Sequence, residues 1–199
     1  MLSCKKNTKR GLLFIISLLA VASMTMITAL EVDDARVTKQ TAPSTCETVP
    51  NIEIAFSPRQ GANKLIIKNI QTAKTTIKVA AYSFTSKPIA QALIDAHRRG
   101  VAISVVLDKS QARDQHSAFK LFQKSGIKTK INNRYAIMHN KFMIIDDQTM
   151  QTGSFNYSRS AEEKNAENVL VIHNDPIVIS QYAEQWKKLW DEAVEYTLH

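Results

Sequence analysis

Cysteine is scarce in this chain of 199 residues, which holds only two, Cys4 and Cys46. Cys4 lies in a basic N-terminal stretch ahead of a long apolar run. A lipid-attachment cysteine would follow such a run, so Cys4 is not expected to carry a lipid. If the leader is removed, Cys46 is left alone, and a single cysteine cannot form an internal disulfide. The scarcity excludes a disulfide-stabilised fold and leaves Cys46 as a free thiol or as a cross-link between chains.

Acidic residues are absent from the first thirty positions, which begin with four bases, Lys5, Lys6, Lys9 and Arg10. The apolar run GLLFIISLLAVASMTMITAL follows, and its Ala-Val-Ala pattern would permit cleavage after Ala22. Residues 1–30 are therefore predicted to be a signal peptide or, if uncleaved, an N-terminal membrane anchor. Either outcome places the body of the chain outside the cytosol. It is periplasmic or secreted after cleavage, and otherwise attached to the membrane through residues 11–30.

The body of the chain has little excess charge. The formal net charge is +8, but the basic start supplies four of these charges, which leaves 22 basic and 18 acidic residues elsewhere, a net +4. This balance permits a polyanionic partner without requiring one. Residues 31–50 show no clear period and are predicted to be a linker. Residues 51–199 remain as one domain, long enough to build a well-packed core.

The body contains no internal repeat, and strand-like and helix-like patterns alternate along it. Strands are predicted at 52–56, 77–84, 101–108, 127–131 and 167–173, a strand pair at 141–146 and 149–153, and helices at 62–74, 88–100, 117–126 and 176–196. This order predicts an α/β fold with a mixed, largely parallel sheet flanked by helices.

The segment MHNKFMIIDDQTMQTGSFNYS, residues 138–158, combines apolar strand patterns with polar groups at fixed intervals. His139 and Lys141 are two apart and share one face of a strand, as do Ser154 and Asn156 on the returning strand. Gly153 permits close approach of the backbone to a ligand. A hairpin would bring these donors together, and such a cluster suits a phosphate diester.

An imidazole in such a cluster can act as nucleophile or as general acid and base, provided that an acceptor holds its second nitrogen. Glu167, at the start of the next strand, is the best candidate for that acceptor. A cation site formed by His139 with Asp146 and Asp147 is the alternative. Lys141 on the same face would repel a cation, and the chain has no His-x-His pattern or clustered carboxylates, so no metal is expected.

The spacing His139-x-Lys141-x4-Asp146-x6-Gly153-Ser154-x-Asn156 resembles the signature of the phospholipase D superfamily. The segments AYSFTS, RRGVAISVVLDKSQ and KNAENVLVI extend the resemblance over about residues 52–195, toward the small single-motif bacterial members typified by a secreted nonspecific endonuclease. The resemblance implies metal-independent phosphodiester cleavage, without a cofactor, through a covalent phosphohistidine.

By this resemblance, His139 attacks phosphorus, Lys141, Ser154 and Asn156 hold the phosphoryl oxygens, and Glu167 orients the imidazole. Asp146 belongs to the same catalytic motif, as a support near the hairpin turn and not as the chemical acid. The family places two motif copies face to face, whereas this chain has one. Because an alkoxide leaves poorly without a proton, the sequence predicts a homodimer with a composite site in which two His139 side chains cooperate.

Several further side chains are predicted to lie near this site. Lys109, Arg113, His116 and Arg134 follow strand ends and are candidates for a substrate groove, although for each residue taken alone the pattern favours a solvated surface side chain. Trp186 and Trp190 are four apart on the last helix and are predicted to pack in the core or at the dimer contact.

Two substrates suit the motif. The first is nucleic acid, DNA and also RNA, cleaved without sequence specificity. The alternative is a phosphatidylcholine-type lipid hydrolysed to phosphatidic acid. A lipase would need an exposed apolar surface where acyl chains enter, and the body of the chain contains no dedicated apolar insertion that would form one. A non-catalytic nucleic-acid-binding protein is disfavoured because every motif position is kept.

Overall fold

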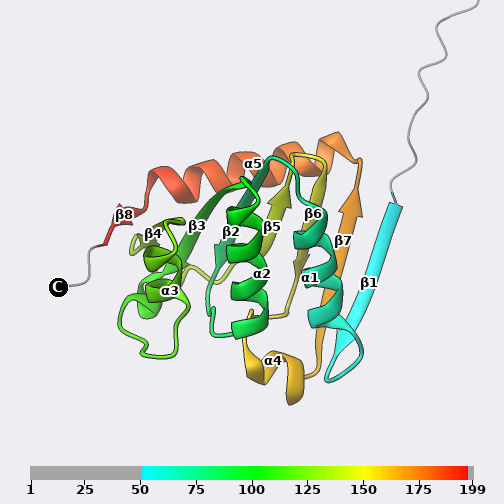
Figure 1. Ribbon diagram of the computed structural model, residues 1–199, viewed down its shortest axis with the longest axis horizontal. Coiled ribbons are helices and arrows are strands. Elements are labelled where there is room, and N and C mark those ends of the chain that lie inside the picture. The colour runs from blue at the N-terminus through cyan, green and yellow to red at the C-terminus, as the bar shows by residue number, and fades with distance from the viewer. Residues whose placement is uncertain (1–50, 197–199) are drawn as a thin grey trace, which may run out of the picture. The chain divides into compact units, whose positions relative to one another are not determined.

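The computed structural model describes residues 51–196 (Figure 1). The predicted leader at 1–30, the linker at 31–50 and Cys46 lie outside the described residues. Among the helices within 51–196, none has both the length and the apolar character needed to cross a membrane.

The described chain folds around one eight-stranded sheet with the order β1-β7-β6-β5-β2-β3-β4-β8. The strands are β1 (Asn51–Ser57), β2 (Thr76–Ala81), β3 (Ala102–Asp108), β4 (Lys128–Asn132), β5 (Lys141–Ile145), β6 (Thr149–Gly153), β7 (Glu167–His173) and β8 (Val194–Glu195). A mixed sheet is confirmed, but the expectation that it is largely parallel is wrong. Only β2, β3 and β4 run parallel, and every other pairing is antiparallel.

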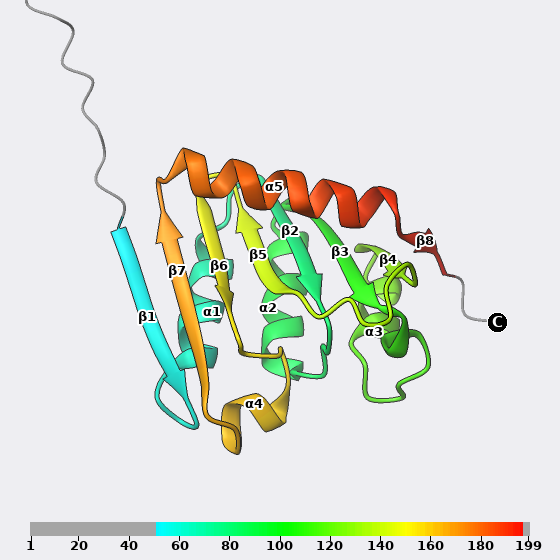
Figure 2. The same ribbon diagram turned by 180° about the vertical axis from the view of Figure 1, so that it is seen from behind.

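Helices cover both faces of the sheet, as predicted. On one face lie α1 (Ala62–Thr72), α2 (Lys87–Arg98) and α3 (Phe119–Lys124), and on the other lies α5 (Pro176–Asp191) (Figures 1 and 2). Each face packs its own apolar cluster. Under α5, the buried Trp186 indole donates a hydrogen bond to the Val79 carbonyl at 2.9 Å and stacks on Trp190, with ring centroids 5.1 Å apart.

Most predicted bounds shift by one to two residues, and larger differences from the sequence prediction occur at the ends of β2 and α5 and at one additional helix. Strand β2 ends at Ala81, because Phe84 instead makes an isolated bridge with Tyr157. Helix α5 ends at Asp191, and β8 follows it along β4. A short helix, α4 (Arg159–Glu163), was not predicted, because it is five residues long and shows no full helical period.

The strand directions bring the polar motif to one edge of the sheet. Parallel β2 and β3 end at this edge, β5 starts there because it runs antiparallel to β2, β6 ends there and β7 starts there. Figure 2 shows these ends together, with α5 crossing the opposite end of the strands. Side chains from distant parts of the sequence therefore meet at this edge.

Candidate active site

His139 and Lys141 form a close pair where β5 begins. His139 is exposed, whereas Lys141 is only 7% exposed. The Lys141 Nζ lies 3.0 Å from the His139 Nδ1 and donates to the His139 carbonyl at 2.7 Å. The two functional groups that the sequence placed on one face are thus in direct contact.

Tyr82, just beyond the end of β2, packs against this pair. Its ring centroid is 4.6 Å from that of His139, and the Lys141 Nζ lies 5.4 Å from the same ring. The sequence prediction did not assign Tyr82 a role. Its only signal was its place in AYSFTS, near the end of the strand predicted at 77–84.

Burial lowers the pKa of the Lys141 ammonium, and the negative charge of Glu167 partly opposes this effect. An ammonium removed from water interacts more strongly with an anion that enters the site, because little solvent screens the charge. The site therefore offers a weakly solvated positive charge beside an accessible imidazole.

Gly153 and Ser154 bring the backbone of β6 close to β7. Gly153 has φ of 151°, and a Cβ there would collide with the Asn168 carbonyl oxygen. The Ser154 amide donates to the Asn168 side-chain oxygen at 3.2 Å, and the Asn168 amide donates to the Ser154 Oγ at 3.1 Å. Within residues 51–196 the Ser154 hydroxyl donates no hydrogen bond, so its hydrogen can bind a ligand, while the two hydrogen bonds with Asn168 hold the residue in position.

Asn156 contributes an amide to the same edge. Its side-chain oxygen is buried and has no hydrogen-bond partner among the described residues. A buried polar atom without a partner is uncommon, and such atoms often lie where a ligand or water binds.

Glu167 lies near the pair without touching the imidazole. Its carboxylate accepts a hydrogen bond from the Asn165 side chain at 3.1 Å, and no hydrogen bond joins it to His139 within residues 51–196. The predicted orienting contact is therefore not made within this single chain. Glu167 instead lines a hollow of about 390 Å³, together with Ser154 and Phe56.

Asp146 is at the opposite end of the hairpin from His139. Its carboxylate accepts backbone N–H groups of Lys74, Thr75 and Thr76 at 2.8–2.9 Å, and the Thr75 hydroxyl at 2.9 Å. Burial raises its pKa, but the hydrogen bonds outweigh burial and hold the pKa below its ordinary value. This carboxylate fastens the β5–β6 turn to the start of β2 and is remote from the chemistry.

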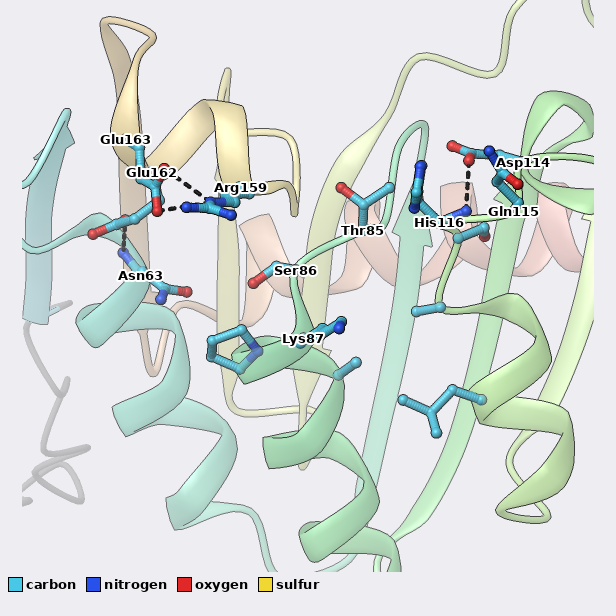
Figure 3. A pocket seen from close by; sticks show the side chains of 15 residues that line it. Asn63, Thr85, Ser86, Lys87, Asp114, Gln115, His116, Arg159, Glu162 and Glu163 are labelled. Carbon is cyan, nitrogen blue, oxygen red and sulfur yellow. Dashed lines mark hydrogen bonds and ion pairs between the residues drawn. The ribbon is translucent and has the colours of Figure 1, made fainter.

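The predicted groove residues occupy different surroundings. Lys109 donates to the Tyr135 carbonyl at 3.2 Å, while Arg134 and Arg113 are exposed. His116 is exposed and lines a hollow of about 910 Å³ beside Lys87. Figure 3 shows His116 and Lys87 on different walls of this hollow.

This larger hollow adjoins the site. The amides of Thr85 and Ser86, on its wall, donate to the carbonyl of Tyr157, the residue after Asn156. Its remaining charges include the ion pair of Arg159 with Glu163 at 2.9 Å. The hollow therefore carries charges of both signs, and the Lys87 ammonium is a group there that can bind an anion.

The described residues 51–196 contain no group of three or more His, Cys, Asp and Glu side chains arranged to hold a metal ion. The cation alternative, in which Asp146 joins His139, is incompatible with the placement of Asp146 at the far end of β5.

Comparison with known proteins identifies the class to which this fold and site belong. The family model described as cardiolipin synthase, phospholipase D-like domain, matches residues 66–190. The chain belongs to the phospholipase D superfamily, whose members are phosphodiester-processing enzymes.

Relatives with assigned names show the same class. A phospholipase D of Rickettsia bellii is 37% identical over 135 residues, which cover 68% of this chain and 67% of the relative. A mitochondrial cardiolipin hydrolase of Chlamydomonas reinhardtii is 35% identical over 120 residues, which cover 60% of this chain and 53% of the relative.

Solved structures share the fold. Nuc of Salmonella typhimurium, a phospholipase D family member, superposes with a TM-score of 0.72 at 35% identity, covering 75% of this chain and all of Nuc. NucT of Helicobacter pylori superposes with a TM-score of 0.69 at 26% identity, covering 74% of this chain and all of NucT.

Proposed function

We propose that this phosphodiesterase is a metal-independent nuclease that cleaves DNA, and also RNA, through a phosphohistidine. The observation that carries the proposal is that an exposed imidazole, a buried ammonium and a fixed hydroxyl lie at one edge of the sheet, where the Asn156 NH₂ group can donate as well. Such a set can bind the oxygens of a phosphodiester and attack its phosphorus.

In the first step, the substrate phosphoryl group would enter between Lys141, Ser154 and Asn156. The Lys141 ammonium now faces the His139 Nδ1, and an ammonium that donates there would require the ring proton on Nε2. Substrate oxygens would attract Lys141 away from the imidazole, and a carboxylate acceptor at Nδ1 would then leave Nε2 unprotonated. Glu167 is the candidate acceptor, reached by a turn of the ring or supplied by a second copy.

The covalent step forms a bond between His139 Nε2 and phosphorus and breaks the bond from phosphorus to the leaving oxygen. That oxygen takes a proton from a second acid and departs as an alcohol. Water then attacks the phosphohistidine, its proton passes to the same second group, and a phosphate monoester is released. We assign the second group to His139 of a partner copy in a homodimer, which gives one composite site per pair.

The choice of nucleic acid rests on the surroundings of the site. Exposed basic residues follow β2, β3 and β4 at the edge that holds His139, namely Lys87, Lys109, Arg113 and Arg134. The phosphate backbone of a nucleic acid can contact several such basic side chains at once. The superposition over the whole of Nuc and NucT adds to the resemblance with single-motif endonucleases.

A phospholipase is the second candidate. It is favoured by the names of the Rickettsia and Chlamydomonas relatives, phospholipase D and mitochondrial cardiolipin hydrolase. The proposed export of the body through residues 1–30, with or without an uncleaved anchor, accommodates either substrate.

The deciding experiment is hydrolysis of plasmid and single-stranded DNA by the purified chain in the presence of EDTA. We expect cleavage with EDTA present, and its loss in the His139→Ala variant. Acid-quenched reactions with ³²P-labelled substrate should trap label on the wild-type chain and not on the variant. Folded protein that leaves DNA intact but hydrolyses phosphatidylcholine vesicles would establish the second candidate.

A further inference from the structure

The edge strand β1 ends in an exposed aromatic ring beside the active site. Ile52, Ile54 and Phe56 alternate along one face of β1 and are 53%, 61% and 51% exposed. Of these three side chains, Phe56 alone also lines the hollow of about 390 Å³ that contains Ser154 and Glu167. The ring of Phe56 is therefore accessible to a ligand that occupies this hollow, whereas the two isoleucines lie outside it.

A row of residues across three neighbouring strands joins Phe56 to the phosphate-binding groups. In the antiparallel ladder, Phe56 lies directly opposite Asn168 of β7, so the two side chains share one face of the sheet. Asn168 in turn exchanges two hydrogen bonds with Ser154, at 3.1 and 3.2 Å. Because adjacent strands lie about 4.8 Å apart, the backbones of Phe56 and Ser154 are about two strand spacings from each other. Their side chains and one nucleotide can bridge this span.

The other groups that line the hollow suit the edge of a nucleobase better than a second phosphate or an acyl chain. Among the residues of the described chain that line it, one is charged, Glu167. Its carboxylate would repel a second phosphate but would accept a hydrogen bond from the amino group of a base. Ser57, Gln60 and Asn168 add further polar groups, and an acyl chain would leave such groups without hydrogen-bond partners.

The position of Phe56 also complements that of the basic residues. In the sheet order, β6 and β5 carry the phosphate-binding groups and lie between β1 on one side and β2, β3 and β4 on the other. The exposed basic residues of the catalytic edge follow β2, β3 and β4. Proteins that bind single strands combine such a basic track for phosphates with aromatic side chains on which bases stack. One flank of the bound phosphate thus offers charge, and the other offers an aromatic face.

We propose that this hollow is a nucleobase subsite, in which the base beside the cleaved phosphodiester stacks on the ring of Phe56. The inference rests on the proposed nuclease function and adds a strand preference to it. A base that is paired and stacked in a duplex must leave the helix before its face can meet Phe56, and this costs free energy. The enzyme therefore cleaves a single strand faster than a duplex of the same sequence.

The test measures kcat/KM of the full chain, in a neutral detergent and EDTA, on three oligomers of equal length. The first is a mixed-sequence oligodeoxynucleotide, the second is its duplex, and the third consists of abasic tetrahydrofuran nucleotides, which keep the phosphates and lack the bases. We expect Phe56→Ala to lower kcat/KM on the single strand about 10-fold, as one lost base–aromatic stack would. On the abasic oligomer, Phe56→Ala should stay within about twofold of wild type.

Three further variants separate stacking from other roles of the side chain. Phe56→Trp keeps an aromatic face and should keep at least about half of the wild-type kcat/KM on the single strand. Phe56→Leu keeps an apolar side chain without a flat face and should lose about as much as Phe56→Ala. The matched control Ile54→Ala shortens an equally exposed side chain on the same face, outside the hollow, and should equal wild type. Circular dichroism checks that each variant is folded.

An equal loss on the DNA strand and on the abasic oligomer in Phe56→Ala would overturn the proposal, because the side chain would then support the fold of the site. Wild-type kinetics of Phe56→Leu, or faster cleavage of the duplex than of the single strand by wild type, would overturn it as well. In each of these cases the chain still cleaves DNA, so the nuclease function stands. A folded wild-type chain that leaves all three oligomers intact would refute the nuclease function itself, and the subsite with it.

Discussion

Replacing Asp146 by Asn tests whether the acidic residue of the motif takes part in the chemistry or holds the hairpin. The carboxylate accepts three backbone N–H groups and one hydroxyl, at 2.8–2.9 Å. Asn keeps the size of the side chain and tolerates the φ of 55° at this position. It loses the charge and turns an NH₂ group toward backbone donors.

The expected loss of stability follows from these contacts. A hydrogen bond to a charged group contributes about 1.5–3 kcal/mol in favourable cases, and four that share one partly exposed carboxylate contribute less than their sum. We expect Asp146→Asn to lower the free energy of unfolding by about 2–3 kcal/mol. The turnover number per folded molecule should stay within about threefold of wild type, because Asp146 does not reach the substrate.

The matched control is Asp147→Asn, in the same turn with φ of 52°. Asp147 makes an ion pair with Lys78, and its side chain is 55% exposed, so its loss should cost at most about 1 kcal/mol. Urea denaturation followed by circular dichroism measures both variants. Near-wild-type stability of Asp146→Asn with a 100-fold loss of turnover would refute the structural role.

The pH dependence gives an independent check on Asp146. Its pKa in the folded state lies below the ordinary value of 3.8, so its stabilisation is present above that value. As the pH falls through the folded-state pKa, this stabilisation is lost. The stability difference between wild type and Asp146→Asn should therefore shrink in strong acid, whereas a constant difference would contradict the linkage.

Three further predictions address the site and the core. Gly153→Ala should destabilise the fold by about 3 kcal/mol or more, measured by urea denaturation, because a Cβ collides with the Asn168 backbone. The rate of DNA cleavage should decline on the alkaline side below pH 10.5, since burial lowers the pKa of Lys141 and its ammonium is required; a pH–rate profile flat to 10.5 would refute this. Trp186→Phe should cost about 1–3 kcal/mol through the lost hydrogen bond to the Val79 carbonyl and the smaller ring, with turnover unchanged.

Local pattern accounts for what the sequence predicted well. Residues 167–173 form a strand over their full predicted length, and the 141–146 and 149–153 segments form a hairpin, because short runs rich in apolar residues, separated by a polar turn, leave few alternatives. Contact between His139 and Lys141 follows from their spacing, two residues apart in extended backbone where β5 begins. The motif also specified the superfamily, which the comparisons confirm.

The errors arose where distant strands must choose partners. Alternating strands and helices suggested a largely parallel sheet, but β1 pairs antiparallel with β7, more than a hundred residues away. Periodicity reports which face of a strand is buried and is silent on which strand lies beside it. Helix α4 was missed because five residues carry too little pattern.

The sequence by itself determined the chemical groups and their local order: an imidazole and an ammonium two residues apart where one strand begins, and a hydroxyl and an amide two residues apart just after the next strand. Tertiary structure alone decided their setting. It buried Lys141 against Tyr82, carried Asp146 to the far end of the sheet, kept Glu167 off the imidazole and left the face of β1 uncovered. The physical reason is that burial and contact depend on segments far apart in the chain, whereas spacing constrains only neighbours along one element.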